Sequence, residues 1–376
     1  MLEPQLTERP IDSPDKAPIF VIGSGRSGTT LLRQMLNAHP RMYIAHESAF
    51  YSYLRLAPRD VTVSQFLDRY LVTFSFAWLR LDPQLVRAAL PPDLTMDRAR
   101  EIFQTVLRTK AQIMGKPRYG EKNPLDTQNL ARIFADFPDA RVIAIMRDPR
   151  PTVHSFNRMP FATSSKLLNA FMCRAQYQHL KVFADRILEV RLEDLSASPK
   201  TTMQSILNFV GEPWDDAVLD HVRRAQTDDL PPVPWFVNAT QQSPSQRESG
   251  LAGREALPPV WTRLIERVNR ELMQHYGYQT AILKQEPSLW DYVRAVAGDV
   301  PGMVEAAYRL LAMKQRLDLH MQGRKLLDPQ REMEQNLQLN PSAWRYYPEF
   351  VMPKLPLLRP QEDSAKEDAE ETRRVG

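Results

Sequence analysis

The sequence predicts an α/β protein in which a central parallel sheet lies between two layers of helices. Two unbroken apolar runs, residues 19–22 and 142–146, have the composition of parallel strands buried on both faces. A glycine-containing loop and a stretch with helical spacing of leucine and methionine follow the first run. We therefore expect a three-layer α/β/α fold that contains a phosphate-binding loop (P-loop). The strands expected in chain order are residues 19–22, 42–45, 141–146 and 186–190.

The loop at residues 23–30 (GSGRSGTT) joins the first strand to the first helix, which should end before Pro40. Gly23, Gly25 and Gly28 let the backbone turn tightly and approach a ligand closely. A strand, such a loop and a helix place free backbone N–H groups and the positive end of the helix dipole at one point, which suits a phosphate. The residues expected to contact this phosphate are Gly25, Arg26, Ser27, Gly28, Thr29 and Thr30.

One residue of this loop bears on which phosphate compound it binds. Gly23 and Gly28 have the spacing of the nucleoside-triphosphate loop G-x-x-x-x-G-K-[ST], but Thr29 stands where that loop has its lysine. Arg26, inside the loop, supplies the positive charge instead. The missing lysine argues against a P-loop kinase or NTPase, which remains an alternative because the glycine spacing matches. A non-catalytic nucleotide-binding scaffold is a second alternative.

A second anion site is predicted after the strand at residues 141–146. Arg147 ends this strand, and ligands of open α/β sheets bind at the carboxyl ends of the strands. Ser155 follows about two helical turns later, so both side chains could contact one phosphate. The alternative interpretation of Arg147 is a structural ion pair with Asp148.

Five segments follow one another along the chain: GSGRSGTTLLRQMLNAHP (23–40), GEKNP (120–124), RVIAIMRDPRPTVHSF (141–156), VRLEDLSASP (190–199) and NFVGEPWD (208–215). They resemble, in order and spacing, the motifs of sulfotransferases that use 3′-phosphoadenosine-5′-phosphosulfate (PAPS), most of all the bacterial and tyrosylprotein branch. The resemblance covers residues 17–280. It implies that PAPS is the co-substrate and that no metal is needed. It also implies that the loop at residues 23–30 binds the 5′-phosphosulfate, and that Arg147 and Ser155 bind the 3′-phosphate.

The reaction that this resemblance implies is in-line transfer of a sulfuryl group from PAPS to a hydroxyl acceptor. In such transfers the protein mainly supplies alignment and charge stabilisation. We assign Arg26 and Lys122 as the cations that stabilise the phosphosulfate; Lys122 could instead be a surface lysine. The acceptor could be a small molecule, a glycan or a tyrosine.

Glu47 is the predicted general base. A helix and the short strand 42–45 separate it from the loop and return it to the same edge of the sheet. Its position also matches the glutamate that acts as base in the tyrosylprotein branch. Burial would raise the pKa of this carboxyl toward neutrality, so that it could take a hydroxyl proton. His46 is the competing base, and because adjacent residues of an extended chain point oppositely, only one of the two should face the substrate.

Two positions bear on how the rest of PAPS would be held. Leu192 stands where the family has a tyrosine that helps to hold adenine. The loop-like segment 227–258 resembles the segment that closes over PAPS in this family, so Ser249 and Arg254 are candidate cofactor contacts. Glu255 follows Arg254 at a place where the family commonly has tryptophan.

The chain divides into an N-terminal arm (1–17), a sulfotransferase-like domain (18–280) and a C-terminal extension (281–376). Within the domain, the helix-rich insert 49–115 should cover the acceptor pocket. The extension should combine helix with extended, proline-punctuated chain and end in an acidic disordered tail. The extension could form a homodimer contact or bind a partner. A closing helix at 261–276 should end the domain, and the extension should contain a helix at 304–321, extended chain at 341–360 and the tail at 361–376.

Composition limits the remaining possibilities. Cys173 is the only cysteine, which excludes internal disulfides and cysteine-based zinc sites, and no cluster of His, Cys, Asp and Glu has metal-ligand spacing. No run approaches the ~20 apolar residues of a membrane span and no signal-like leader is seen, so we expect a cytoplasmic protein. The net charge is +4, and since the tail holds six acids and three bases the body carries about +7, which suits anionic PAPS. No nucleic-acid-binding motif is present.

Overall fold

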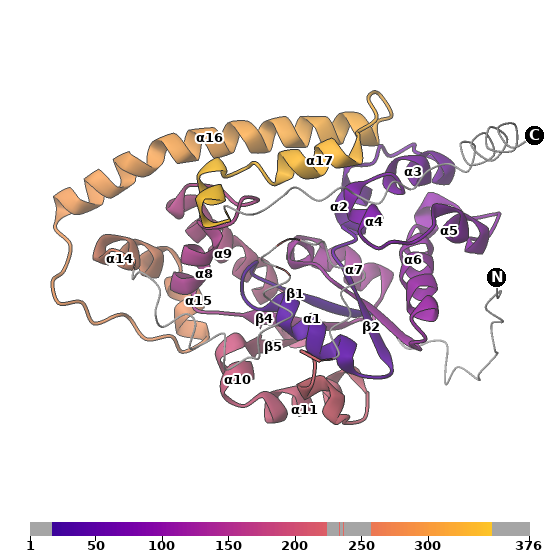
Figure 1. The fold of residues 1–376 in the computed structure, drawn as a ribbon, viewed down its shortest axis with the longest axis horizontal. Helices are drawn as coiled ribbons and strands as arrows, with labels where there is room; N and C mark the ends of the chain where they lie inside the picture. Colours follow the sequence, from indigo (N-terminus) through magenta and orange to yellow (C-terminus); the bar gives the residue numbers. More distant parts are fainter. Residues whose placement is uncertain (1–16, 224–232, 234–235, 237–256, 348–376) are drawn as a thin grey trace, which may run out of the picture.

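A parallel five-stranded sheet forms the centre of the protein in the computed structural model, which describes residues 17–223, 233, 236 and 257–347 (Figure 1). The strand order is β2-β3-β1-β4-β5, and every neighbouring pair is parallel. Helices cover both faces, which confirms the predicted three-layer fold. The strands are β1 (Ile19–Gly23), β2 (Met42–His46), β3 (Arg118–Lys122), β4 (Arg141–Met146) and β5 (Ile187–Arg191).

The four predicted strands are confirmed to within a residue, but the prediction misses β3, which lies between β2 and β1. Its sequence, RYGEK, has no apolar run, so the pattern that identifies the other buried strands is absent. All five residues of β3 are nevertheless buried, and three of them are charged. Lys122 therefore ends a central strand of the sheet.

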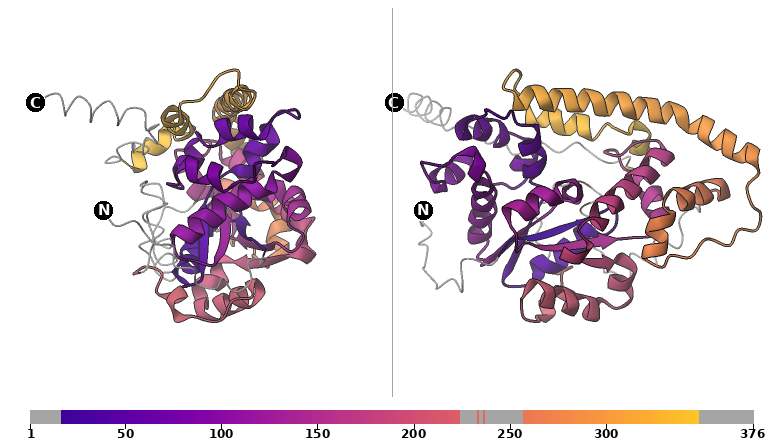
Figure 2. Two further views of the ribbon diagram at one scale, coloured as in Figure 1. Left: turned by 90° about the vertical axis from the view of Figure 1, so that its right-hand side faces the viewer. Right: turned by 180° about the vertical axis from the view of Figure 1, so that it is seen from behind.

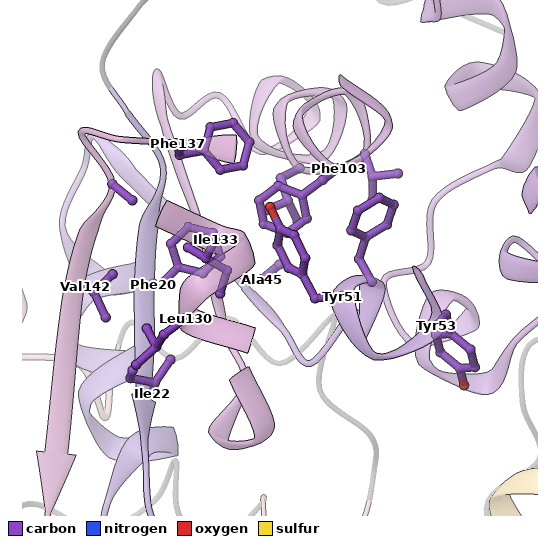
Figure 3. Close-up of a cluster of buried hydrophobic side chains, with 14 of the residues drawn as sticks. Phe20, Ile22, Ala45, Tyr51, Tyr53, Phe103, Leu130, Ile133, Phe137 and Val142 are labelled. Atoms are coloured by element: carbon purple, nitrogen blue, oxygen red, sulfur yellow. The ribbon is translucent and has the colours of Figure 1, made fainter. Parts of the chain in front are cut away.

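Two apolar cores form on the two faces of the sheet because successive side chains of a strand point to opposite sides. Val21 of β1 packs toward one layer and Phe20 toward the other. Figure 3 shows Phe20 with Tyr51 and Phe103, and the rings of Phe20 and Phe103 stack at 5.5 Å. The first layer contains α1 (Thr29–Ala38), α10 (Leu192–Ala197) and α11 (Pro199–Val210), and the second contains α2 (Phe50–Leu56), α6 (Arg100–Ile113) and α7 (Leu130–Asp136).

The helix-rich insert between β2 and β3 is confirmed. Side chains cap several of its helices: Thr62 forms a capping box with Gln65, and the Thr73 hydroxyl accepts from the backbone N–H of Phe76. Besides α2 and α6, the insert contains α3 (Val63–Tyr70), α4 (Phe74–Ala77) and α5 (Pro83–Ala89). Between β4 and β5 lie α8 (Pro149–Phe156) and α9 (Lys166–Lys181).

The C-terminal part contains more helix than predicted. Asn269 divides the single helix expected at 261–276 into α14 (Pro259–Val268) and α15 (Arg270–His275). A capping box at Ser288 starts the next helix earlier than expected, so α16 runs over Leu289–Met321.

Residues 341–346, predicted as extended chain, form a short 3-10 helix, η5 (Pro341–Tyr346), after α17 (Pro329–Asn336). The rest of the expected extended segment and the acidic tail lie outside the described residues.

The C-terminal extension packs on the domain at several points. Asp299 of α16 accepts the backbone N–H groups of Lys166 and Leu167 at the start of α9, each at 3.0 Å. Met333 of α17 packs in a cluster with Phe156 of α8. Figures 1 and 2 show α16 along the outer edge of the molecule. No helix in the described part of the chain has both the length and the apolar character needed to cross a membrane.

Candidate active site

The loop after β1 adopts a conformation that requires glycine at two positions. Gly23 has φ 142°, and a Cβ there would lie 2.1 Å from the Ile145 carbonyl oxygen. Gly28, with φ 103°, precedes α1, which has no side-chain cap at its N-terminus. The first N–H groups of α1, including those of Thr29 and Thr30, therefore point out of the helix end without intrahelical acceptors. This geometry can bind an anion.

Ser27 has a different part in the loop from the one predicted. Its hydroxyl lies 2.6 Å from the Ile145 carbonyl oxygen and 2.5 Å from the Ser24 carbonyl oxygen, and its backbone N–H donates to Ser24 at 3.1 Å. A hydroxyl has one proton to donate, so the Ser27 side chain holds the loop against β4 instead of offering that proton to a phosphate.

Arg26, Arg147 and Ser155 come together beside the loop. Arg26, in the left-handed conformation with φ 66°, donates from Nε to the Ser155 hydroxyl at 3.1 Å. Arg147 donates to the Arg26 carbonyl oxygen at 3.5 Å. Asp148 caps α8 and pairs with Arg150 at 2.5 Å. We call Arg26, Arg147 and Ser155 the anion cradle.

A second polar group forms where β2 and β3 end. His46 and Lys122 are partners in the parallel register, and the Glu47 N–H donates to the Lys122 carbonyl oxygen at 2.9 Å. The Lys122 amine contacts the Glu47 carboxylate and lies 3.3 Å from His46 Nε2. The predicted return of Glu47 to the sheet edge thus brings it to Lys122. His46, Glu47 and Lys122 are candidates for catalysis from the sequence, and we call them the catalytic cluster.

The geometry of Glu47 differs from expectation in two respects. Its side chain is 31% exposed, so the carboxylate is not the fully buried group that the sequence suggested. Its φ of 23° takes it out of the extended conformation, so the alternation of a strand does not apply and both Glu47 and His46 reach Lys122. Because His46 itself is fully buried, Glu47 is the more accessible of the two candidate bases.

Burial sets the protonation of the other two members of the catalytic cluster. The pKa of His46 lies well below its ordinary value because of burial and the nearby charges of Lys122 and Arg33. His46 is therefore a neutral imidazole near pH 7. Burial also lowers the pKa of Lys122, and the Glu47 carboxylate opposes this change by favouring the ammonium form.

Aromatic side chains cover the catalytic cluster. The ring of Phe236 meets the His46 ring edge-on at 4.5 Å and lies 5.4 Å from the Lys122 amine. Trp78, which follows α4 of the insert, lies 6.0 Å from the His46 ring. Trp78 belongs to the insert that the sequence predicts to cover the acceptor. The sequence predicts no role for Phe236, because the only recognisable feature near it is a proline-rich segment.

Two buried carboxyl groups lie beneath the turn that carries Glu47. Burial, with the nearby charge of Asp126, raises the pKa of Glu121 to about 8, while the Ser48 hydroxyl and the backbone N–H groups of Ser48 and Ala49 oppose the shift. Burial likewise raises the pKa of Asp126 to about 7. Glu121 precedes Lys122 on β3 and so points to the opposite face of the sheet. Sequence reasoning missed both carboxyls because it missed the strand.

Leu192 belongs to the apolar core under the loop, and a Cβ on Gly28 would lie 2.6 Å from its Cδ1. Ser249 and Arg254 lie outside the described residues. Within the described ranges, no group of three or more His, Cys, Asp and Glu could hold a metal ion.

Comparison with known proteins places these features in one family. The model of the sulfotransferase family matches residues 18–216, which is just over half of the chain and includes the loop, the anion cradle and the catalytic cluster. The chain belongs to the sulfotransferase family.

Two relatives show how far the similarity extends. A protein-tyrosine sulfotransferase 1 of Danio rerio is 30% identical over 218 residues, 55% of this chain and 56% of that protein. A protein-tyrosine sulfotransferase of Drosophila melanogaster is 28% identical over 216 residues, 54% of this chain and 40% of that protein. The chain thus spans about half the length of these relatives.

One solved structure supports the fold. The sulfotransferase domain from the olefin synthase of Synechococcus PCC 7002 matches with a TM-score of 0.50 at 20% sequence identity. The match covers 71% of this chain and 98% of that domain.

Proposed function

We propose that this protein transfers the sulfuryl group of PAPS to a hydroxyl acceptor. The observation that carries the proposal is the position of two groups at the carboxyl edge of one parallel sheet: the anion cradle after β1 and β4, and the catalytic cluster after β2 and β3. A nucleotide with a phosphate at each end needs two cationic sites, and a hydroxyl acceptor needs a base beside one of them.

The anion cradle and the helix end have separate tasks in this proposal. The N–H groups at the start of α1, together with Arg26, Thr29 and Thr30, hold the 5′-phosphosulfate. Arg147 and Ser155 hold the 3′-phosphate, since a guanidinium and a hydroxyl both donate to phosphate oxygens. Glycine at positions 25 and 28 lets the loop lie close against Phe156 and Leu192, which positions the backbone N–H groups of the loop.

The catalytic cluster supplies proton transfer and charge stabilisation. Glu47 takes the proton of the acceptor hydroxyl while the acceptor oxygen bonds to sulfur. The bond between sulfur and the bridging phosphate oxygen breaks, and its electron pair leaves with 3′,5′-ADP. Lys122, beside Glu47, and Arg26 stabilise the charge that develops on the bridging oxygen. Neutral His46 packs against Lys122 and holds its amine in place.

The acceptor is a hydroxyl compound; a small molecule, a glycan and a tyrosine each fit this chemistry. The two relatives described above are protein-tyrosine sulfotransferases, which makes a phenol the first acceptor to test.

Calorimetric titration of the full chain with 3′,5′-ADP, 5′-AMP and ATP with magnesium tests the nucleotide. We expect 3′,5′-ADP to bind at least ~10-fold more tightly than 5′-AMP, because the 3′-phosphate adds charge-assisted hydrogen bonds. Preference for ATP with magnesium, followed by its turnover, would establish the kinase or NTPase alternative instead.

Product formation tests the chemistry separately. The protein is incubated with PAPS and, in turn, a simple phenol, a tyrosine peptide and a sugar alcohol, and the sulfated product is measured. Tight binding of 3′,5′-ADP with no product from any acceptor class, and with the same affinity in Glu47→Gln, would favour the non-catalytic scaffold.

A further inference from the structure

The longest helix of the molecule has two unlike faces. On its inner face, Asp299, Ala306, His320 and Met321 are buried, and the helix packs on α2, α3, α9 and α14. Its outer face lies along the edge of the molecule, away from the sheet (Figures 1 and 2). Every residue of α16 is described, so the composition of the outer face can be followed along its whole length.

An apolar stripe with heptad spacing runs along this outer face. Its seven members are all exposed and alternate in steps of three and four residues, as the a and d positions of a coiled coil do. None of them is charged. The stripe consists of Trp290, Val293, Ala297, Val300, Val304, Ala307 and Leu311.

The stripe is large enough to form an interface. It extends over three heptads, about 32 Å of helix. Trp290 is 70% exposed, Val304 64% and Leu311 68%, and the adjoining Leu289 and Tyr308 are 77% and 74% exposed. Together the exposed apolar side chains of this face present on the order of 700 Å² per chain. That exceeds the ~300–600 Å² of the largest patch on a typical monomer and approaches the ~800 Å² that each partner buries in a stable complex.

We propose that the outer face of α16 is a self-association surface, on which a second copy of this chain packs in antiparallel orientation about a two-fold axis. This inference concerns a part of the chain beyond the sulfotransferase match and does not depend on the proposed reaction.

Size complementarity favours a second copy in this orientation. Antiparallel packing of an a position against a d position places Trp290 opposite Ala307 of the second copy, so the largest side chain meets one of the smallest. In the same register Val293 faces Val304. The pairs repeat on both sides of the axis because a two-fold interface is self-complementary.

Sedimentation velocity of the full chain at micromolar concentration tests the interface. We expect a dimer for the wild type and a monomer for Val304→Glu and for Val293→Glu, because each variant places a charge among the paired apolar side chains of the stripe. Val182→Glu is the matched control: Val182 is 75% exposed but lies outside the stripe, so this variant should remain dimeric. The far-UV circular dichroism spectra and the 3′,5′-ADP binding of the variants should match wild type, which separates this test from that of the proposed function.

A monomeric wild type would overturn the proposal, and so would a dimer that persists in both seam variants. Loss of the dimer in Val182→Glu would show that a charge added anywhere dissociates the dimer. That result would also contradict an interface formed specifically by the stripe.

Disulfide cross-linking tests the orientation. The native Cys173 is only 1% exposed, so introduced cysteines can be oxidised selectively. Antiparallel packing places Ala297 opposite Val300, so Ala297→Cys and Val300→Cys should cross-link with each other when the two proteins are mixed. Cross-linking of each variant mainly with itself would indicate parallel helices and overturn the antiparallel arrangement.

Discussion

The two halves of the candidate active site hold different kinds of cation. In the anion cradle, Arg26 and Arg147 donate to neutral oxygen atoms, a hydroxyl and a backbone carbonyl. In the catalytic cluster, Lys122 is buried and already meets a carboxylate, that of Glu47. A guanidinium has five N–H donors and stays charged when it binds an anion, whereas a buried lysine needs a counter-charge to remain an ammonium. The cradle is thus suited to binding and the cluster to chemistry.

Removal of the Glu47 carboxylate should have the largest effect on turnover. We expect Glu47→Gln to lower kcat by at least ~100-fold, as for loss of a general base, while 3′,5′-ADP binding changes little. Product formation and calorimetry on the same samples measure the two effects. Glu101→Gln is the matched control, because Glu101 is also partly exposed and paired with an arginine but lies on α6 of the insert. Equal losses of kcat and nucleotide affinity in Glu47→Gln would mean that this carboxylate supports binding instead of proton transfer.

Removal of an arginine from the cradle should act on binding. Arg147→Ala should weaken 3′,5′-ADP by ~10- to 100-fold, because charge-assisted hydrogen bonds are worth about 1.5–3 kcal/mol, and 5′-AMP far less. Arg141→Ala at the other end of β4, where Arg141 stacks on Phe209, should leave both affinities unchanged. If Arg147→Ala weakens the two nucleotides equally, the assignment of Arg147 to the 3′-phosphate is wrong.

The buried carboxyls beneath the catalytic cluster should make stability depend on pH. The pKa values of Glu121 and Asp126 are raised in the folded protein to about 8 and about 7, so the folded state keeps protons that the unfolded chain has released. The free energy of unfolding should therefore fall as the pH rises from about 4 to about 8.

Glu121→Gln should reduce this fall, because an amide needs no proton to stay neutral. The variant should be more stable than wild type at pH 8 by on the order of 2–4 kcal/mol, and similar to it near pH 5. Urea unfolding at the two pH values measures this difference. The same loss of stability with pH in the variant and in wild type would show that Glu121 does not carry the effect.

His46 should give the smallest effect on turnover. The pKa of His46 is far below the ordinary value, so it stays neutral across the working range. The pH profile of kcat/KM should therefore have no step near pH 6.5 from His46, and wild type and His46→Gln should have the same profile there. We expect His46→Gln to lower kcat by less than ~10-fold, since the amide can still contact Lys122. A loss as large as that of Glu47→Gln would make His46 the base.

His46 contributes stability that is lost as the pH falls below about 6.5, because the unfolded chain then binds a proton more readily.

The strand, loop and helix at residues 19–38 and the placement of Arg147 and Ser155 on one short segment could be predicted because each depends on residues close together in the chain. The apolar run before Gly23 identifies β1, and the eight-residue step from Arg147 to Ser155 spans one short helix. A strand, a loop and a helix have one favourable arrangement, so local spacing is sufficient to place these side chains.

The catalytic cluster depends instead on strand order, which local pattern does not contain. Lys122 and Glu47 meet because β3 lies beside β2 and ends in register with it, and β3 has no apolar run that would identify it as a buried strand. The contact also needs the positive φ of Glu47, which turns the side chain away from the direction that an extended chain would give.

The sequence by itself determined the fold class, the family motifs and the candidate residues for anion binding, because short-range sterics and burial patterns specify them. Tertiary structure alone decided how Glu47 meets Lys122, which groups surround Glu121 and Phe236, and which face of α16 is exposed. These features join segments far apart in the chain, and only packing of the whole molecule sets their distances, burial and charge environment.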